Sequence, residues 1–88
     1  MRMNKESIKE KVRAYVKQNF LLESELIDDK ESFTQAGVVD SIGIIELVDF
    51  ICREFNVDIP EELLSPDNLD SIESVTNLIT KLLKNGNK

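Results

Sequence analysis

Apolar residues recur at three- and four-residue steps in three segments of the chain, and no segment shows the strict alternation of a β-strand. Such steps place apolar side chains along one side of an α-helix. The three segments cover residues from about 4 to 22, from 41 to 55 and from about 70 to 83. With a helical turn over about 61–64 and a plain turn at 65–68, they predict an all-α fold. We expect three main helices and one short helix, packed as a small bundle.

Each main helix has candidate N-cap residues and an apolar side. Ser, Asp and Asn are preferred N-caps because their side chains accept a hydrogen bond from a free backbone N–H. The candidate caps are Asn4 or Ser7 (in a capping box with Glu10), Asp40 or Ser41, and Asp70 or Ser71. The apolar sides are Ile8, Val12, Tyr15, Val16, Asn19 and Phe20 in the first helix; Ile42, Ile45, Val48, Ile51, Cys52 and Phe55, beside Ile44 and Leu47, in the second; and Ile72, Val75, Leu78, Ile79 and Leu82 in the last.

A long polar connection over residues 23–40 separates the first two helices. Loops of this length in compact domains are often functional. We expect Phe33 and Val38 to attach it to the core, and Gly37 to supply a turn or a close backbone approach. Gly43, in the first turn of the second helix, costs up to about 1 kcal/mol relative to Ala. Close packing or a bulky group passing nearby would explain it.

The length of 88 residues predicts a single domain over 1–88, with a disordered tail at about 85–88. The net charge of −6 argues against nucleic acid and anionic membranes, which bind proteins through Lys and Arg. It favours protein partners that carry basic patches. The sequence shows neither a signal peptide nor a run of apolar residues long enough to span a membrane. We therefore expect a cytoplasmic monomer.

The chain contains no His, which removes the commonest general base and metal ligand. Ser-His-Asp and Cys-His catalytic devices are thus excluded, and the many carboxylates are expected to solvate the surface. The acidic connection does not fit an EF-hand, because its Gly and Glu residues fall at the wrong positions. Cys52 lies on an apolar side and is expected to be a buried structural residue. We predict no enzymatic activity and no metal site.

Ser41 stands where the long connection meets the second helix. A side chain at such a junction is exposed and yet held by a rigid element, which suits covalent attachment. The alternative is that Ser41 serves only as an N-cap. The tripeptide Asp-Ser-Ile occurs again at 70–72, but there it lacks the preceding Gly-Val-Val and the long connection.

Around Ser41 the chain contains a longer pattern, made of Gly37-Val38-Val39-Asp40-Ser41-Ile42, Ile45-Glu46-Leu47-Val48, Glu54-Phe55 and Val57-Asp58-Ile59-Pro60-Glu61-Glu62. In this pattern it resembles the acyl carrier protein family and the related peptidyl and aminoacyl carriers, over nearly its whole length. The resemblance implies that Ser41 carries 4′-phosphopantetheine, moved from coenzyme A by a Mg²⁺-dependent phosphopantetheinyl transferase. The arm would hold an acyl or aminoacyl thioester. Since the family places its serine before the second helix, Ser71 is expected to be a cap or first-turn residue of the last helix.

The resemblance also implies partner proteins that contact the second helix through Arg and Lys. Besides the transferase, these are an acyl- or aminoacyl-adenylating ligase and a downstream synthase or transferase. The candidates for partner recognition are Asp40, Ile42, Ile45, Glu46 and Asp49, although the pattern leaves open whether the two isoleucines belong to the core. An acyl cargo is expected to lie between the helices, among Ile45, Val48, Phe55, Ile59 and Leu64. An aminoacyl cargo would stay outside.

The chain departs from the fatty-acid-synthesis members of the family at two places. They usually have an acidic residue where this chain has Gly43, and an acidic run where it has Cys52-Arg53-Glu54. We therefore expect a free-standing carrier of a specialised biosynthetic pathway. A housekeeping fatty-acid carrier and an unmodified helical interaction module remain the alternatives.

Overall fold

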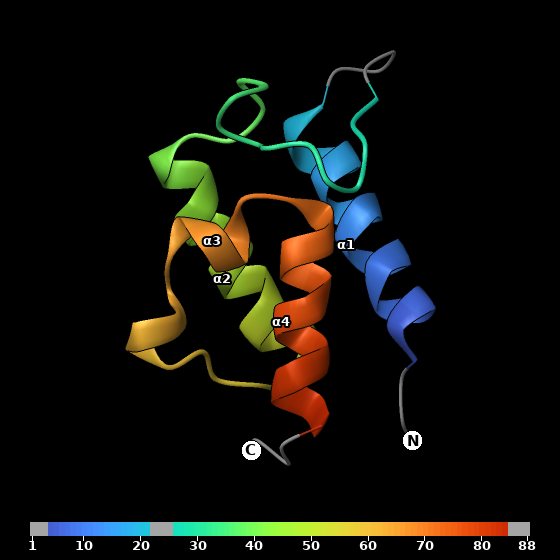
Figure 1. Ribbon diagram of the computed structural model, residues 1–88, viewed down its shortest axis with the longest axis vertical. Helices are drawn as coiled ribbons and strands as arrows, with labels where there is room; N and C mark the ends of the chain where they lie inside the picture. Colours follow the sequence, from blue (N-terminus) through green and yellow to red (C-terminus); the bar gives the residue numbers. More distant parts are fainter. Residues whose placement is uncertain (1–3, 22–25, 85–88) are drawn as a thin grey trace.

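The computed structural model describes residues 4–21 and 26–84, and every regular element within these ranges is helical. The predicted fold of three main helices and one short helix is confirmed (Figure 1). The predicted tail at 85–88 lies outside the described residues, as does position 22, where the first helix was expected to end. The elements are α1 (Lys5–Phe20), α2 (Ser41–Phe55), the 3₁₀ turn η1 (Glu61–Leu63), α3 (Pro66–Leu69) and α4 (Ile72–Lys84).

Asn4 caps the start of α1, and its side-chain oxygen accepts a 2.8 Å hydrogen bond from Ser7 N. Of the two candidate starts Asn4 is correct, and Ser7 lies within the helix. Asn19 was expected on the apolar side but is exposed, and its amide donates to Tyr15 O at 2.9 Å. Tyr15 and Phe20 are half-buried. The fully buried residues of α1 are Ile8, Val12 and Val16.

Helix α2 has the predicted bounds. Asp40 caps its start, and Asn56 ends it in the left-handed conformation at φ 56°. Ile42 and Ile45, which the sequence left open between the core and the partner face, are 67% and 68% exposed, so they do not belong to the buried side of α2. Cys52 is half-buried rather than buried. The buried residues of α2 are Gly43, Leu47, Ile51 and Phe55.

Close packing accounts for Gly43. A Cβ at this position would lie 2.8 Å from Val39 Cγ1 and 3.1 Å from Phe20 Cε1. The end of α1 and the last residues of the loop therefore approach the first turn of α2 more closely than any larger residue permits. Of the two explanations that the sequence left open, packing is the correct one.

The predicted plain turn at 65–68 is wrong, since these residues start the four-residue helix α3. Pro66 occupies its first position, where a missing N–H costs nothing. The Asn68 amide holds the approach to α3 by donating to Leu63 O at 3.0 Å and to Ser65 Oγ at 3.3 Å. The expected helical turn at 61–64 is present as η1.

Helix α4 starts after Ser71, whose Oγ accepts a 3.0 Å hydrogen bond from Ser74 N. Of the two candidate caps Ser71 is therefore the one used, and Asp70 has a different role. All five residues of the predicted apolar stripe of α4 are buried. In Figure 1 helices α1 and α4 lie side by side, and α3 packs against α4. The apolar sides of α1, α2 and α4 form one core.

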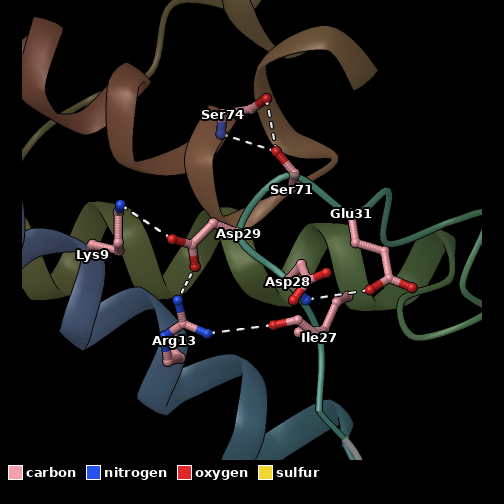
Figure 2. A network of polar contacts seen from close by, with 8 residues as sticks. All are labelled: Lys9, Arg13, Ile27, Asp28, Asp29, Glu31, Ser71 and Ser74. Carbon is pink, nitrogen blue, oxygen red and sulfur yellow. Dashed lines mark hydrogen bonds and ion pairs between the residues drawn. The ribbon is translucent and has the colours of Figure 1, made fainter.

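The loop over residues 26–40 crosses one end of the bundle and is fastened to it. Phe33 is fully buried, as predicted, and Val38 is half-buried against the core. Figure 2 shows a polar attachment at Asp29, whose carboxylate pairs with Lys9 at 3.2 Å and with Arg13. The Asp29 carbonyl accepts a 2.8 Å hydrogen bond from Glu73 N on α4. The loop thus connects α1 to α4 before it reaches α2.

Candidate functional site

Ser41 is the first residue of α2, and its side chain is exposed. Its hydroxyl makes no hydrogen bond with the described residues. The cap of α2 comes from Asp40 instead, whose Oδ1 accepts a 2.8 Å hydrogen bond from Gly43 N. Of the two candidate caps Asp40 is therefore correct, and the Ser41 hydroxyl is accessible for chemistry.

The start of α2 also suits a negatively charged group. The first backbone N–H groups of this 15-residue helix have no intrahelical acceptor, so they carry a partial positive charge. An anion attached at Ser41 would lie beside these groups. The exposed Ser41 hydroxyl and the helix end that would favour a negative charge therefore belong to the same element.

A groove of about 570 Å³ opens beside Ser41, between α2 and the segment that leads through α3. Its volume lies in the range of small-molecule sites, and most of its surface is apolar. The apolar lining consists of Ile44, Ile45, Val48, Leu64, Pro66 and Leu69. The polar lining consists of Thr34, Asp40, Ser41, Ser65 and Asp70.

Three of the five residues predicted to surround an acyl cargo line this groove, namely Ile45, Val48 and Leu64. The other two are elsewhere: Phe55 is buried in the core, and Ile59 is half-buried against it. The wall from α3 was missed, because four residues are too few to show a helical period. The signal for it was Pro66, which favours the first position of a helix.

All five residues predicted for partner recognition are exposed, on α2 or directly before it. Ile42 and Ile45, which the sequence left open between partner face and core, belong to the surface. Together with Asp40, Glu46 and Asp49 they place apolar and acidic side chains around Ser41. Exposed large apolar side chains beside charged ones are typical of protein-binding surfaces.

On the side of α2 that faces α1, the rings of Tyr15 and Phe50 stack with centroids 4.0 Å apart. The Tyr15 hydroxyl donates to Glu46 O at 3.3 Å. Burial raises the pKa of the Tyr15 hydroxyl, and the negative charges of Glu46 and Asp49 raise this pKa further, whereas Arg53 lowers it. Two of the predicted partner residues, Glu46 and Asp49, therefore act electrostatically on Tyr15, with Arg53 opposing them.

Ser71, in the second Asp-Ser-Ile tripeptide, differs from Ser41 in both respects that matter for attachment. It is only 6% exposed, and its hydroxyl bonds to Ser74 through the N–H and the side chain of that residue, each at 3.0 Å. Figure 2 shows Ser71 within the contact between the loop and the start of α4. Its expected role as a cap of the last helix is confirmed.

Within the described ranges, no helix is long and apolar enough to cross a membrane. The same part of the chain brings no three Cys, Asp or Glu side chains into an arrangement that could hold a metal ion.

Comparison with known proteins assigns the family. The family model described as the phosphopantetheine attachment site matches residues 10–79, so the prosthetic group of this domain is 4′-phosphopantetheine. An acyl carrier protein from Thermosynechococcus vestitus is 31% identical over 77 residues, which cover 88% of this chain and 93% of that protein. With the four-helix fold and a site suited to the prosthetic group, the chain belongs to the acyl carrier protein family.

Proposed function

We propose that Ser41 is the residue that carries 4′-phosphopantetheine, and that the chain is a free-standing acyl carrier of a specialised biosynthetic pathway. The observation that carries the choice of residue is the contrast between two serines with the same neighbours. Ser41 is exposed and unbonded among the described residues, whereas Ser71 is buried and bonded. A transferase can reach only the first without unfolding the start of α4.

The attachment reaction requires only an accessible serine hydroxyl of the carrier and no catalytic residue. The Ser41 oxygen would attack the phosphorus of coenzyme A that bears pantetheine, which forms the Ser41–phosphate bond and breaks the P–O bond to adenosine 3′,5′-bisphosphate. The transferase supplies Mg²⁺ and the base that takes the serine proton. The start of α2 favours the charge of the product. Family members carry groups and do not catalyse reactions, and we propose the same for this chain.

The groove beside Ser41 supports an acyl cargo over an aminoacyl one. Its lining is mostly apolar, so an alkyl chain gains from entering it, whereas a charged amine loses its hydration there. When bound, the prosthetic group supplies a thiol that holds the cargo as a thioester. The groove residues Ile45, Val48 and Leu64 would shield the alkyl chain of the cargo from water.

The specialised role is supported by the packing at Gly43. Housekeeping fatty-acid carriers usually have an acidic residue there, and this chain has no room even for a Cβ. The relative from Thermosynechococcus vestitus matches this chain over 93% of its own length, so the likeness covers a whole carrier domain. We propose a phosphopantetheinyl transferase, an acyl-adenylating ligase and a downstream synthase or transferase as partners. Asp40, Ile42, Ile45, Glu46 and Asp49 would form the face that they contact.

Intact-protein mass spectrometry tests the attachment. The protein is incubated with coenzyme A, Mg²⁺ and a broad-specificity transferase, beside Ser41→Ala and Ser71→Ala. We expect one added phosphopantetheine on the unchanged protein and on Ser71→Ala, and none on Ser41→Ala. Addition to no folded variant would leave the unmodified interaction module as the better interpretation.

The pathway needs a separate measurement, which is the mass of the acyl groups on the protein isolated from its own cells. We expect a single kind of acyl group, because a carrier of a specialised pathway serves one product. A range of long-chain acyl groups would favour the housekeeping fatty-acid role instead.

A further inference from the structure

The carboxylate of Asp70 accepts hydrogen bonds from the loop before α2. The two loop residues, Ser32 and Thr34, precede Asp70 by 38 and 36 residues in the sequence. Its Oδ1 accepts a 3.1 Å hydrogen bond from Thr34 N. Its Oδ2 accepts one from Ser32 Oγ and a longer one, at 3.4 Å, from Thr34 Oγ1. One side chain at the end of α3 therefore holds the loop segment 32–34 by three hydrogen bonds.

The main chain reinforces this contact. Phe33 N donates a 2.7 Å hydrogen bond to Asp70 O, and the Phe33 ring is fully buried. The next residue, Ser71, is buried and caps α4. The loop and the α3–α4 junction are thus joined at Asp70, with the core behind them.

Thr34 and Asp70 also line the groove beside Ser41. They form a polar wall in a groove that is otherwise mostly apolar. Helix α3 has only four residues, so regular helical hydrogen bonds do little to fix this wall. Its position depends instead on tertiary contacts, among which the hydrogen bonds of the Asp70 side chain hold Thr34 directly.

We propose that Asp70 determines which acyl chains the carrier accepts, because its hydrogen bonds to Ser32 and Thr34 close one side of the groove and limit the length of chain that enters. The inference rests on the proposed function, since it concerns the cargo attached through Ser41. It assigns to Asp70 the role of a specificity-determining residue that acts by holding Thr34 in place.

The physical reason lies in what an alkyl chain would have to displace. To pass the wall, it must break the hydrogen bonds of Asp70 and leave a carboxylate without partners against apolar atoms, which is costly. The chain therefore fills the groove as far as the wall, and further methylene groups stay in water. Each buried methylene stabilises the folded protein, so thermal stability reports how much of the chain has entered.

The test loads Ser41 directly from butyryl-, hexanoyl-, octanoyl-, decanoyl- and dodecanoyl-coenzyme A, with a broad-specificity transferase and Mg²⁺. The Tm of each product is then measured. For the unchanged protein, we expect the Tm to rise with chain length up to a limit and then to level off. For Asp70→Ala, we expect this limit to move by at least two carbons toward longer chains.

Two control variants separate this role from a merely structural one. Asp70→Asn keeps an acceptor for Thr34 N and a partner for the Ser32 hydroxyl, so it should keep the original limit. Asp67→Ala removes an exposed acid from α3 and should also keep it. A structural role of Asp70 would lower the Tm of every acyl form by the same amount and leave the limit in place, and this result overturns the proposal.

If Asp70→Ala does not fold, Thr34→Ala replaces it, because Thr34 is exposed and forms the other half of the wall. The chain length at which the Tm of Thr34→Ala levels off should also move toward longer chains, and an unchanged chain length overturns the proposal. Failure of Ser41 to accept any acyl group overturns the proposed function itself. Mass spectrometry recognises that case, since no variant would then carry an added mass.

Discussion

At the scale of single residues, Gly37 and Gly43 are needed for different reasons. Gly37 has a φ of +72°, which side chains with a Cβ rarely adopt, although nothing lies within 4 Å of where its Cβ would be. Gly43 has an ordinary helical conformation, and its constraint is the space taken by Val39 and Phe20. Backbone conformation requires the first glycine, and side-chain packing requires the second.

Gly43→Ala sets two opposing effects against each other. Ala is favoured over Gly within a helix by about 1 kcal/mol, but its Cβ would lie 2.8 Å from Val39 Cγ1. Overpacking a buried site costs about 1–3 kcal/mol, and the short, branched Val39 cannot swing away. We expect urea denaturation to show a net loss of about 1 kcal/mol in the free energy of unfolding. With Val39→Ala already in place, Gly43→Ala should become neutral or stabilising; a loss that persists there would contradict the packing explanation.

Thr76 has a buried hydroxyl without a hydrogen-bond partner among the described residues. Thr76→Val keeps the shape of the side chain and removes the polar group. We expect the free energy of unfolding to rise by about 1 kcal/mol, because the folded state no longer buries an unpaired hydroxyl. Thr80→Val is the matched control, since Thr80 Oγ1 donates to Thr76 O at 2.8 Å and this bond would be lost. Equal effects of the two changes would contradict this explanation.

Tyr15, the one tyrosine of the sequence, makes the stability of the folded protein depend on pH, and its pKa shift gives the direction. Its pKa is raised above the ordinary value of 10.0, first by burial and then by Glu46 and Asp49. As the pH rises through that value, the unfolded chain loses the proton before the folded protein does. The folded protein then holds more protons, so its stability falls with rising pH. We expect denaturation between pH 9 and 11 to show a decline that is smaller in Tyr15→Phe; parallel curves would contradict the assignment.

At the scale of elements, the bounds of α2 could be predicted from the sequence and its orientation could not. Asp40 before the helix and the break after Phe55 are local signals, and they mark both ends correctly. Apolar residues, however, occur almost all round α2, so periodicity cannot decide which side faces the core. The close approach of Val39 and Phe20 to Gly43 turns that side inward and leaves Ile42 exposed. This contact depends in part on Phe20, which is distant in sequence.

The second groove wall was beyond prediction for a related reason. Four residues cannot show a helical period, so α3 was expected to be a turn. Asp70 was expected to cap the last helix because Asp is a preferred cap. The loop segment 32–34 competes for its carboxylate, and Ser71 takes the cap. Local preference predicted that the Asp70 carboxylate accepts backbone hydrogen bonds, and tertiary contacts determine that the donors come from the loop.

The attachment of the loop to α1 can be tested at Asp29. Its carboxylate pairs with Lys9 and Arg13, but all three side chains are partly exposed, so the pairs contribute little each. We expect Asp29→Ala to lower the free energy of unfolding by at most about 1 kcal/mol, and by less at high salt. Hydrogen exchange at residues 27–37 should become faster. Asp28→Ala, at an exposed neighbour, should change neither; an effect as large as that of Asp29→Ala would contradict the role of the ion pairs.

At the scale of the whole molecule, the residue pattern around Ser41 predicted the family, whereas composition only narrowed the classes of function to consider. The absence of His excluded familiar catalytic devices, and the charge of −6 pointed to basic protein partners. The position of Ser41 followed from its local pattern. The groove did not, because its lining comes from α2, α3 and the loop at Thr34, which only the folded chain brings together.

Charge distribution, rather than net charge alone, should govern recognition by the transferase. Glu46 lies exposed on α2 five residues after Ser41, whereas Glu10 lies exposed on a different helix, α1, and is not among the predicted partner residues. Glu46→Lys and Glu10→Lys change the net charge equally, so both weaken long-range attraction to a basic partner to a similar degree. Only Glu46→Lys places a like charge within the contact. We expect kcat/KM for phosphopantetheine transfer to fall about tenfold for Glu46→Lys and far less for Glu10→Lys, with both losses shrinking at high salt. Equal losses would mean that the transferase responds to overall charge and does not contact this side of α2.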